Sequence, residues 1–215
     1  MKTILFFFLF IGISSLTLQG IDVSVYQKSI NWPVVAQNKH FAIIRAGYGN
    51  NGIDTYWETN YKGAKNAGVK IGAYWYSYAA SVDDAKSEAN AFVKALRGKK
   101  FEWPVYYDIE EDSIFKANLQ DKIAKAFCDI LESNKYYCGI YTGAYVLNHN
   151  FNAETKRRYT IWVAHWDVSK PSYNGNYDVW QKKVGTSPGI SGACDLDEGY
   201  TNFEPIMKQN HLNGY

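Results

Sequence analysis

The chain has 215 residues, of which 47% are hydrophobic, 17% aromatic and 20% charged. This length suits a single domain with a sizeable core. The 23 Lys and Arg nearly balance the 21 Asp and Glu, and a net charge of +2 gives no broad cationic surface, so nucleic acid is not an expected partner. The 7 Trp, 18 Tyr and 11 Phe exclude a disordered, low-complexity chain.

The N-terminus has the pattern of a secretory signal peptide. Lys2 supplies a positive charge, residues 4–13 form an apolar run with a single glycine, and Ser and Thr follow. The run is too short to cross a membrane, which takes about 20 residues. We expect a signal peptide over residues 1–19, whose cleavage leaves a protein without membrane attachment, secreted or held in a secretory or lysosomal lumen. An uncleaved anchor is the alternative.

Three cysteines, Cys128, Cys138 and Cys194, are too few for a disulfide scaffold. A secreted protein can form disulfides, but an odd number leaves at least one thiol unpaired or bonded to another chain. We expect a monomer, and two interpretations of its cysteines stay open. Either all three are buried free thiols, or one disulfide forms.

Strand-like segments recur along the chain, each rich in β-branched or aromatic residues and bounded by turn residues. Helical patterns lie between the early ones, at residues 32–38, 60–67, 81–96 and 113–134, and the third opens on a capping sequence at Ser81. The eight strand-like segments are residues 20–26, 41–48, 70–78, 104–110, 137–142, 160–166, 177–181 and 193–197.

The alternation of strands and helices predicts an α/β domain with a mainly parallel sheet. The first five strands are separated by intervals long enough for crossover helices, whereas the last three follow one another closely. Eight strands in one domain indicate a TIM-like barrel that lacks helices on its closing side, with its chemistry at the C-terminal ends of the strands. We assign this barrel to residues 20–204 and expect the polar tail, residues 205–215, to dangle or to cap it.

Two carboxylates end the fourth strand-like segment. Because side chains alternate along a strand, Asp108 and Glu110 point to the same face. Two like charges held together raise one pKa, which keeps a carboxylic acid protonated for proton donation. The alternative is that these acids cap the following helix, and this accounts for Glu111 and Asp112 but not for Asp108, which lies inside the strand.

Further acids are expected at the same end of the barrel. Asp22 lies on the first strand and Asp195 on the last, and these strands are neighbours in a closed barrel, so both acids can approach Asp108 and Glu110. Acids in an aromatic pocket are typical of a glycoside hydrolase cleft, where rings stack on sugars. Alternation turns some rings outward into the core. The aromatic candidates near strand ends are Tyr74, Tyr76, Tyr107, Tyr141 and Trp166.

Motifs for other chemistry are weak. The glycine-rich segment 47–52 matches a dinucleotide fingerprint, but the helix start that such a site uses does not follow it. Asp108, Glu110 and Asp112 alternate as in a calcium loop, but the 12-residue ligand pattern is missing. The four histidines show no paired spacing for zinc. We expect neither a metal nor a cofactor.

A series of motifs in the same order resembles glycoside hydrolase family 25, the Chalaropsis-type lysozymes. The series runs from Gly20 to about Phe203 and so covers essentially the whole mature chain. Any one motif is weak, but together they are specific, and the chain departs little from the pattern: Cys194 stands where an apolar residue is usual. The motifs are residues 20–24 with Gln27, 41–49, 72–77, 105–110, 139–142, 161–164 with Trp166, 180–181 and 192–197.

The resemblance implies a flattened (β/α)5(β)3 barrel that hydrolyses the β-1,4 bond between N-acetylmuramic acid and N-acetylglucosamine in bacterial peptidoglycan. The family's D-x-E motif falls on Asp108 and Glu110, with Glu110 as general acid/base, and its outer aspartates fall on Asp22 and Asp195. The short D-x-E spacing resembles hydrolases in which the substrate's own 2-acetamido oxygen attacks, so that Asp108 would stabilise an oxazolinium intermediate. Inversion, with Asp22 or Asp195 activating water, is the alternative mechanism.

Two other functions stay open beside this muramidase. A sugar-binding relative without turnover would keep the cleft, but here all four acids are present. A chitinase-type hydrolase shares the D-x-E motif and differs in its substrate.

Overall fold

The computed structural model describes residues 17–215, and most of the signal peptide expected at residues 1–19 lies outside this range. Within the range, no helix combines the length and the apolar character needed to cross a membrane.

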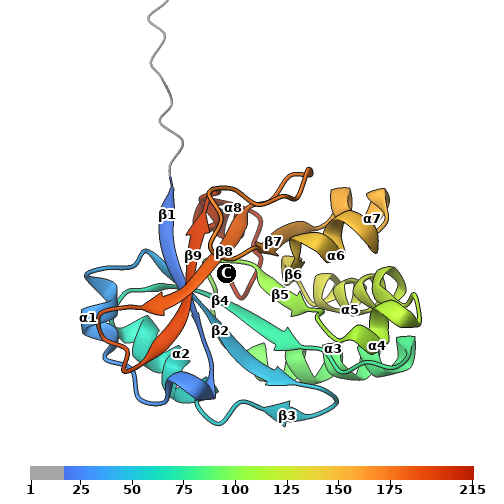
Figure 1. Cartoon of the computed structure of the whole chain (residues 1–215). Helices are drawn as coiled ribbons and strands as arrows, with labels where there is room; N and C mark the ends of the chain where they lie inside the picture. The colour runs from blue at the N-terminus through green and yellow to red at the C-terminus, as the bar shows by residue number, and fades with distance from the viewer. Residues whose placement is uncertain (1–16) are drawn as a thin grey trace, which may run out of the picture.

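Nine strands form one sheet that closes into a barrel (Figure 1). In chain order they are β1 (Leu18–Val23), β2 (Phe41–Tyr48), β3 (Gly52–Ile53), β4 (Lys70–Tyr76), β5 (Val105–Asp108), β6 (Cys138–Gly143), β7 (Thr160–Ala164), β8 (Val179–Thr186) and β9 (Ala193–Gly199). Parallel pairing runs from β1 through β2, β4, β5, β6 and β7 to β8. β9 closes the barrel by antiparallel pairing with β8 and β1, and short β3 only extends the edge of β2. The predicted (β/α)5(β)3 barrel of eight strands is confirmed.

Helices cover the outside of the barrel (Figure 1). They are α1 (Trp32–Ala36), α2 (Trp57–Asn66), α3 (Val82–Leu96), α4 (Asp112–Lys116), α5 (Gln120–Ser133), α6 (Ala144–His149), α7 (Ala153–Arg158) and α8 (Phe203–Gln209), with a 3-10 turn η1 (Val25–Gln27) after β1. α3 begins where its sequence predicts, since the Ser81 hydroxyl accepts a hydrogen bond from the Asp84 backbone N–H at 3.1 Å.

The prediction of a single helix over residues 113–134 is wrong. The chain forms two helices there, α4 and α5, and the break lies at residues 117–119. Asn118 adopts a left-handed conformation with φ 52°, which Asn tolerates better than most residues. α4 itself begins at Asp112, close to the acidic end of β5.

Side chains alternate between the barrel interior and the layer under the helices. On β5, Tyr106 points inward and packs edge-on against Trp162, whereas Tyr107 points outward and stacks on Phe127 of α5 with ring centroids 3.7 Å apart. The interior is mostly aromatic. Its buried members are Phe41, Ile43, Tyr74, Trp103, Tyr106, Tyr141, Trp162, Val179, Phe203 and Met207.

Two glycines make room for this interior. A Cβ atom at Gly20 of β1 would lie 2.2 Å from the ring of Phe41, and one at Gly199 of β9 would lie 2.3 Å from the ring of Trp103. Phe41 and Trp103 stack face to face at 3.7 Å, so any larger residue at these two strand positions would displace the packed rings.

The C-terminal tail caps the N-terminal end of the barrel. Phe203 and Met207 of α8 are buried in the interior cluster. Asn213 is fully buried, and its side chain accepts a hydrogen bond from the Tyr137 N–H at 2.7 Å and donates one to the Trp103 carbonyl at 2.8 Å. Of the two possibilities for the tail, capping is therefore the one adopted.

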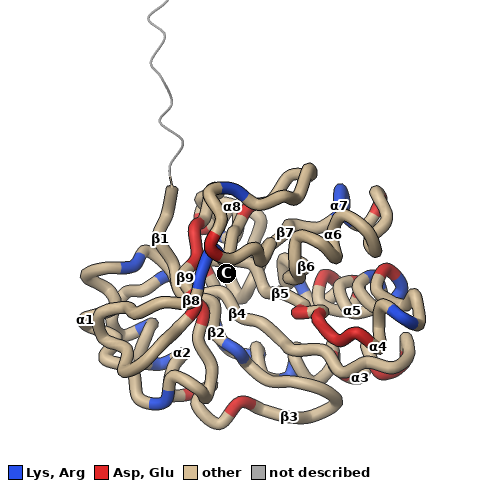
Figure 2. The backbone as a smooth tube through the Cα atoms, viewed as in Figure 1, with Lys and Arg blue, Asp and Glu red and all other residues tan. Residues whose placement is uncertain are grey.

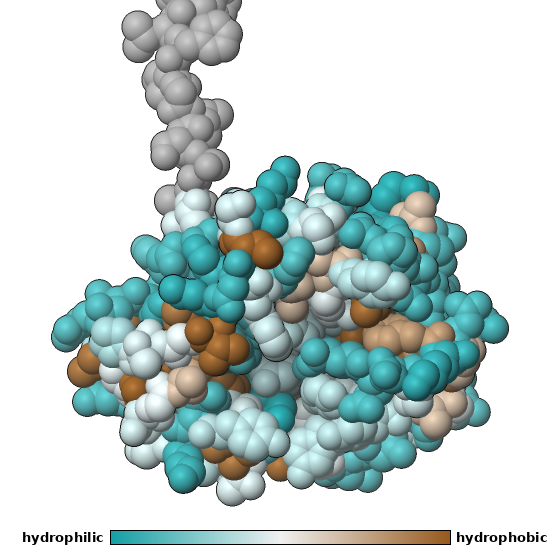
Figure 3. All heavy atoms as spheres, viewed as in Figure 1, coloured by the Kyte–Doolittle hydropathy of each residue, from teal (hydrophilic) through white to brown (hydrophobic). Residues whose placement is uncertain are grey.

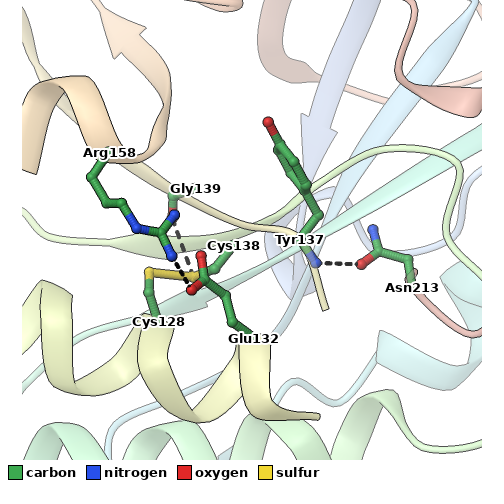
Figure 4. The surroundings of a disulfide bond; sticks show 7 residues. All are labelled: Cys128, Glu132, Tyr137, Cys138, Gly139, Arg158 and Asn213. Atoms are coloured by element: carbon green, nitrogen blue, oxygen red, sulfur yellow. Dashed lines mark hydrogen bonds and ion pairs between the residues drawn. A yellow bond between two sulfur atoms is a disulfide. The ribbon is translucent and has the colours of Figure 1, made fainter. Parts of the chain in front are cut away.

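Cys128 of α5 and Cys138 of β6 form a disulfide, with Cα atoms 5.5 Å apart (Figure 4). Cys194 is free and buried, so the interpretation with one disulfide is correct. In the chain-entropy model, closing so short a loop stabilises the fold by about 3 kcal/mol. Beside the disulfide, Arg158 of α7 forms an ion pair with Glu132 of α5 (Figure 4).

We predict that Asn213→Ala lowers the free energy of unfolding by about 2–4 kcal/mol, because it removes two hydrogen bonds and leaves buried backbone groups unpaired. Asn213 also has φ 53°, which alanine adopts less readily. Urea denaturation would measure the change. The control is Asn210→Ala, since Asn210 is exposed and its side chain donates only to the Ile206 carbonyl. Equal stability of the two variants would show that the Asn213 side chain adds nothing to the fold.

Candidate active site

A cavity of about 250 Å³ lies at the C-terminal ends of the barrel strands. The face seen in Figure 3 is hollowed near its centre, and acidic positions lie on β9 and between β5 and α4 (Figure 2). All four acids predicted from the sequence line this cavity. Its lining consists of Asp22, Ser24, Tyr26, Gln27, Arg45, Tyr74, Tyr76, Asp108, Glu110, Tyr141, Trp162, Trp166, Gln181 and Asp195.

A larger cavity, of about 830 Å³, lies near the N-terminal end of β7, at Thr160 and Asp178. Its charged residues are the basic end of α7 and a single aspartate, and the aspartate side chain accepts hydrogen bonds from Thr160 and Thr201. Converging acids are found only in the smaller of these two cavities, so we place the candidate active site there.

Asp108 and Glu110 form a pair at the end of β5. Asp108 is 3% exposed, whereas Glu110 is exposed at the mouth of the cavity. Burial, and next the Glu110 charge, raise the pKa of Asp108 well above its usual range. Burial also raises the pKa of Glu110, but the hydrogen bond between the two carboxyl groups lowers it. The sequence predicts one raised pKa, whereas the structure raises both, and the rise is larger for the buried Asp108.

A second group of acids, Asp22, Asp195 and Asp197, lies on the neighbouring strands β1 and β9. Asp22 of β1 faces Asp195 of β9 in the antiparallel register. Asp197, two residues further along β9, is fully buried and accepts a hydrogen bond from Trp162 Nε1 at 2.8 Å. Burial is the main reason why the pKa of Asp197 rises to about 8, and burial with the Asp197 charge raises the pKa of Asp22. Burial and the neighbouring carboxyl groups therefore both oppose the ionisation of Asp22 and Asp197.

Asp197 was not among the site residues predicted from the sequence. The signal was present, because the rule that places Asp108 and Glu110 on one face of a strand applies equally to Asp195 and Asp197. The rule does not show how deeply each side chain is buried. Asp195 lines the cavity, and Asp197 lies beneath it, bonded to Trp162.

Gln181 of β8 connects three residues of the cavity wall and was also not predicted as a site residue. Its Nε2 donates to Asp22 Oδ2 at 2.7 Å, while its Oε1 accepts hydrogen bonds from Tyr141 Oη and Trp166 Nε1, each at 2.8 Å. Only an amide offers a donor and an acceptor in this arrangement. Gln181 thus fixes the indole of Trp166, which is 50% exposed, over the acids.

Four of the five aromatic candidates, Tyr74, Tyr76, Tyr141 and Trp166, line the cavity, and Tyr107 does not. The prediction for Tyr107 is wrong because alternation along β5 turns its ring outward, where its hydroxyl donates to Glu88 Oε2 of α3 at 2.5 Å.

Three further residues line the cavity and were not predicted from the sequence as site residues: Tyr26, which is 77% exposed, Arg45 and Trp162. Within residues 17–215, no cluster of three or more His, Cys, Asp and Glu side chains has an arrangement that could hold a metal ion.

We predict that Asp197 makes the protein less stable as pH rises. Its folded pKa of about 8 lies above the value of about 3.9 in an unfolded chain, so the unfolded state loses the proton first. Stability from this group is complete below about pH 4 and falls as pH rises toward 8. In Asp197→Asn, the free energy of unfolding should decline less between pH 5 and pH 8, as urea denaturation would show. Asp167→Asn, which removes an exposed carboxylate, is the control and should keep the wild-type slope.

Comparison with known proteins agrees with this fold. A family model described as "Glycosyl hydrolases family 25" matches residues 21–189, most of the chain. The autolytic lysozyme of Clostridium acetobutylicum is 31% identical over 183 residues, which make up 84% of this chain and 55% of that protein, so the chain spans about half the length of this relative. Protein YegX of Escherichia coli (strain K12) is 30% identical over 193 residues, 86% of this chain and 70% of that protein.

The fold is likewise that of a solved lysozyme structure. The bacterial lysozyme from Streptomyces coelicolor superposes with a TM-score of 0.78 at 27% identity, over 90% of this chain and 97% of that one. The closed barrel, the matched family model and these relatives lead to one assignment: the chain belongs to glycosyl hydrolases family 25.

Proposed function

We propose that this protein is a lysozyme that hydrolyses the β-1,4 bond between N-acetylmuramic acid and N-acetylglucosamine in bacterial peptidoglycan. The observation that carries the proposal is the Asp108–Glu110 pair, whose pKa values are both raised, at the mouth of a cavity lined by two more acids and several aromatic rings. Membership of family 25 and the lysozyme relatives support it. Tyr74, Tyr76, Tyr141 and Trp166 supply rings and hydroxyl groups for sugar binding.

Glu110 acts as general acid and base in this proposal. It is exposed, so it can reach a glycosidic oxygen, and its pKa is raised by burial of the carboxyl group against the cavity wall. In the first step the acetamido oxygen forms a bond to C1, the bond from C1 to the leaving oxygen breaks, and Glu110 gives its proton to that oxygen. Glu110 then takes a proton from the water that opens the oxazolinium ring.

Asp108 prepares the substrate for this step. Its Oδ1 is buried and makes no hydrogen bond with the described part of the chain, so it can accept one from the acetamido N–H. A hydrogen bond of this kind favours the ionised form of Asp108, so that the proton of the pair is held by Glu110, where catalysis needs it. Ionised Asp108 also stabilises the positive charge of the oxazolinium ring.

The inverting mechanism is less well supported. It requires Asp22 or Asp195 to take a proton from water, and therefore to be ionised. Burial raises the pKa of both groups, and the Asp197 and Asp195 charges raise that of Asp22 further. We assign these two aspartates to the binding of the attacked sugar and retain Asp108 and Glu110 for the chemistry.

We further propose that the protein acts outside the cell or in a secretory or lysosomal lumen, as a monomer. The Cys128–Cys138 disulfide supports this, since disulfides persist in oxidising compartments. Residues 1–19 would supply the signal for export.

We predict that the purified protein releases peptidoglycan fragments whose reducing end is N-acetylmuramic acid, recognised as muramitol by mass analysis after borohydride reduction. Glu110→Gln should lower the rate by about 10²–10⁴-fold, because the amide has no proton to donate. The neighbouring Glu111→Gln is the control, since Glu111 accepts a hydrogen bond from Tyr76 and does not line the cavity. Fragments ending in reduced glucosamine, or chitin oligomers cleaved faster than cell wall, would contradict a muramidase.

We predict that Asp108→Asn lowers kcat by about 10²–10³-fold with a smaller effect on binding, because its charge matters most as the oxazolinium forms. The alkaline limb of the rate profile should also move to lower pH. In the wild type, the Asp108 charge makes the last proton of the pair harder to remove, and the variant lacks that charge. A profile that stays in place would show that the pair does not act as one unit.

A further inference from the structure

Arg45 brings a positive charge to a cavity of acids. It lies on β2, and among the residues lining the cavity within the described range 17–215 it is the only Lys, Arg or His, against four carboxyl groups. The proposed chemistry above makes no use of it. An acidic cavity repels an anionic substrate, so the presence of this single cation raises the question of what it binds.

The guanidinium is held rigidly. Its Nε donates to Asp54 Oδ2 at 2.8 Å, and Asp54 is itself buried and fixed by the backbone N–H groups of Val25 and Tyr56, each at 2.9 Å. The guanidinium carbon also lies 5.1 Å from the ring centroid of Tyr26 and 5.6 Å from that of Tyr48. Cation–π contacts and the ion pair together leave the group little freedom.

The outer edge of this group has no partner in the protein. Arg45 uses Nε for Asp54, and neither Nη1 nor Nη2 donates a hydrogen bond to the described part of the chain. The side chain is nonetheless only 12% exposed, and it faces the cavity. A guanidinium with its two outer nitrogens free presents a planar pair of donors, which matches a carboxylate in a bidentate geometry.

We propose that Arg45 binds the free carboxylate of the lactyl substituent on muramic acid units whose carboxyl group carries no peptide, and so selects these units over glucosamine at the attacked sugar. The inference rests on the proposed muramidase function and names the residue that gives it specificity. The two sugars differ only in the lactyl ether at C3, whose carboxyl group is the chemical feature that a guanidinium recognises. Arg45 also offsets the repulsion between that group and the cavity acids.

A structural role for Arg45 makes a different prediction. Arg45 lowers the pKa of the neighbouring Asp108, and it neutralises buried Asp54. If these were its only functions, replacing it would weaken the binding of every sugar polymer to a similar extent. Recognition of the lactyl group instead predicts a loss confined to substrates that carry it.

The test compares two ligands with the same β-1,4 backbone. One is a peptide-free glycan chain that alternates glucosamine with muramic acid bearing free lactyl carboxylates, and the other is a chitooligosaccharide of equal length. Binding is measured by calorimetry with the full chain carrying Glu110→Gln, so that turnover is not required. The outcome is then separable from the proposed reaction, which is tested independently by the fragments that the wild type releases.

Adding Arg45→Gln should weaken binding of the glycan about 10- to 100-fold and change binding of the chitooligosaccharide by less than about 2-fold, the range for a lost hydrogen bond to a charged group. Arg45→Lys keeps the charge beside Asp54 but loses the planar pair of donors. It should weaken binding of the glycan selectively as well, by a smaller factor. Arg157→Gln, on exposed α7 at the other end of the barrel, removes the same charge and should change neither ligand.

Thermal unfolding of each variant checks that the fold is kept. Equal weakening of both ligands, in Arg45→Gln and in the milder Arg45→Lys, would overturn the proposal and leave Arg45 a structural residue. Unchanged glycan binding in a folded Arg45→Gln variant would overturn it as well.

Discussion

Carboxyl groups crowded into one small cavity are the constraint on which the active end of this barrel depends. Asp22, Asp108, Glu110 and Asp195 line one cavity, and Asp197 lies beneath it. Five negative charges in such a space would repel one another strongly, so protons must neutralise part of the cluster. Accordingly, burial raises the pKa of all five groups, and neighbouring carboxyl charges raise several of these pKa values further.

The rest of the structure holds these pairs in register. On the outer side of β5, Glu88 of α3 accepts hydrogen bonds from the Tyr107 hydroxyl, the Ser77 hydroxyl at 3.0 Å and the Tyr78 N–H at 2.8 Å. The Ser77 N–H in turn donates to the Asp108 carbonyl at 2.9 Å. A buried glutamate behind the sheet thus ties the ends of β4 and β5 together, and the catalytic pair inherits its position from that contact.

Periodicity explains why so much of this arrangement could be predicted from the sequence. Strand alternation and the succession of strands and helices predict the barrel, and alternation also places Asp108 with Glu110 and Asp22 with Asp195 at one end. The same alternation excludes Tyr107, but only once the inward face of β5 is known, because both Tyr106 and Tyr107 are aromatic. The helix break at Asn118 depends on one residue in a left-handed conformation, which helical periodicity does not reveal.

Contacts between distant segments could not be predicted from local pattern. Gln181 and Asp22 are 159 positions apart, and only the closed barrel brings the amide to the carboxylate. The partnership of Arg45 with Asp54, Tyr26 and Tyr48 likewise joins η1, β2 and the segment after β3. Each of these residues is ordinary in isolation, and its chemistry arises from the partner that the fold supplies.

The two ends of the barrel divide stability from function. At the N-terminal end, stacked rings and the buried Asn213 pack the interior without a charge, and this packing stabilises the fold. At the other end, the acids destabilise the fold at neutral pH, because their raised pKa values mean that ionisation is opposed by burial. A substrate that donates hydrogen bonds to these acids, and offers a carboxylate to Arg45, relieves that opposition. Binding energy is then gained from groups that the free protein keeps in an unfavourable state, which is the condition for moving a proton to Glu110 when the sugar is in place.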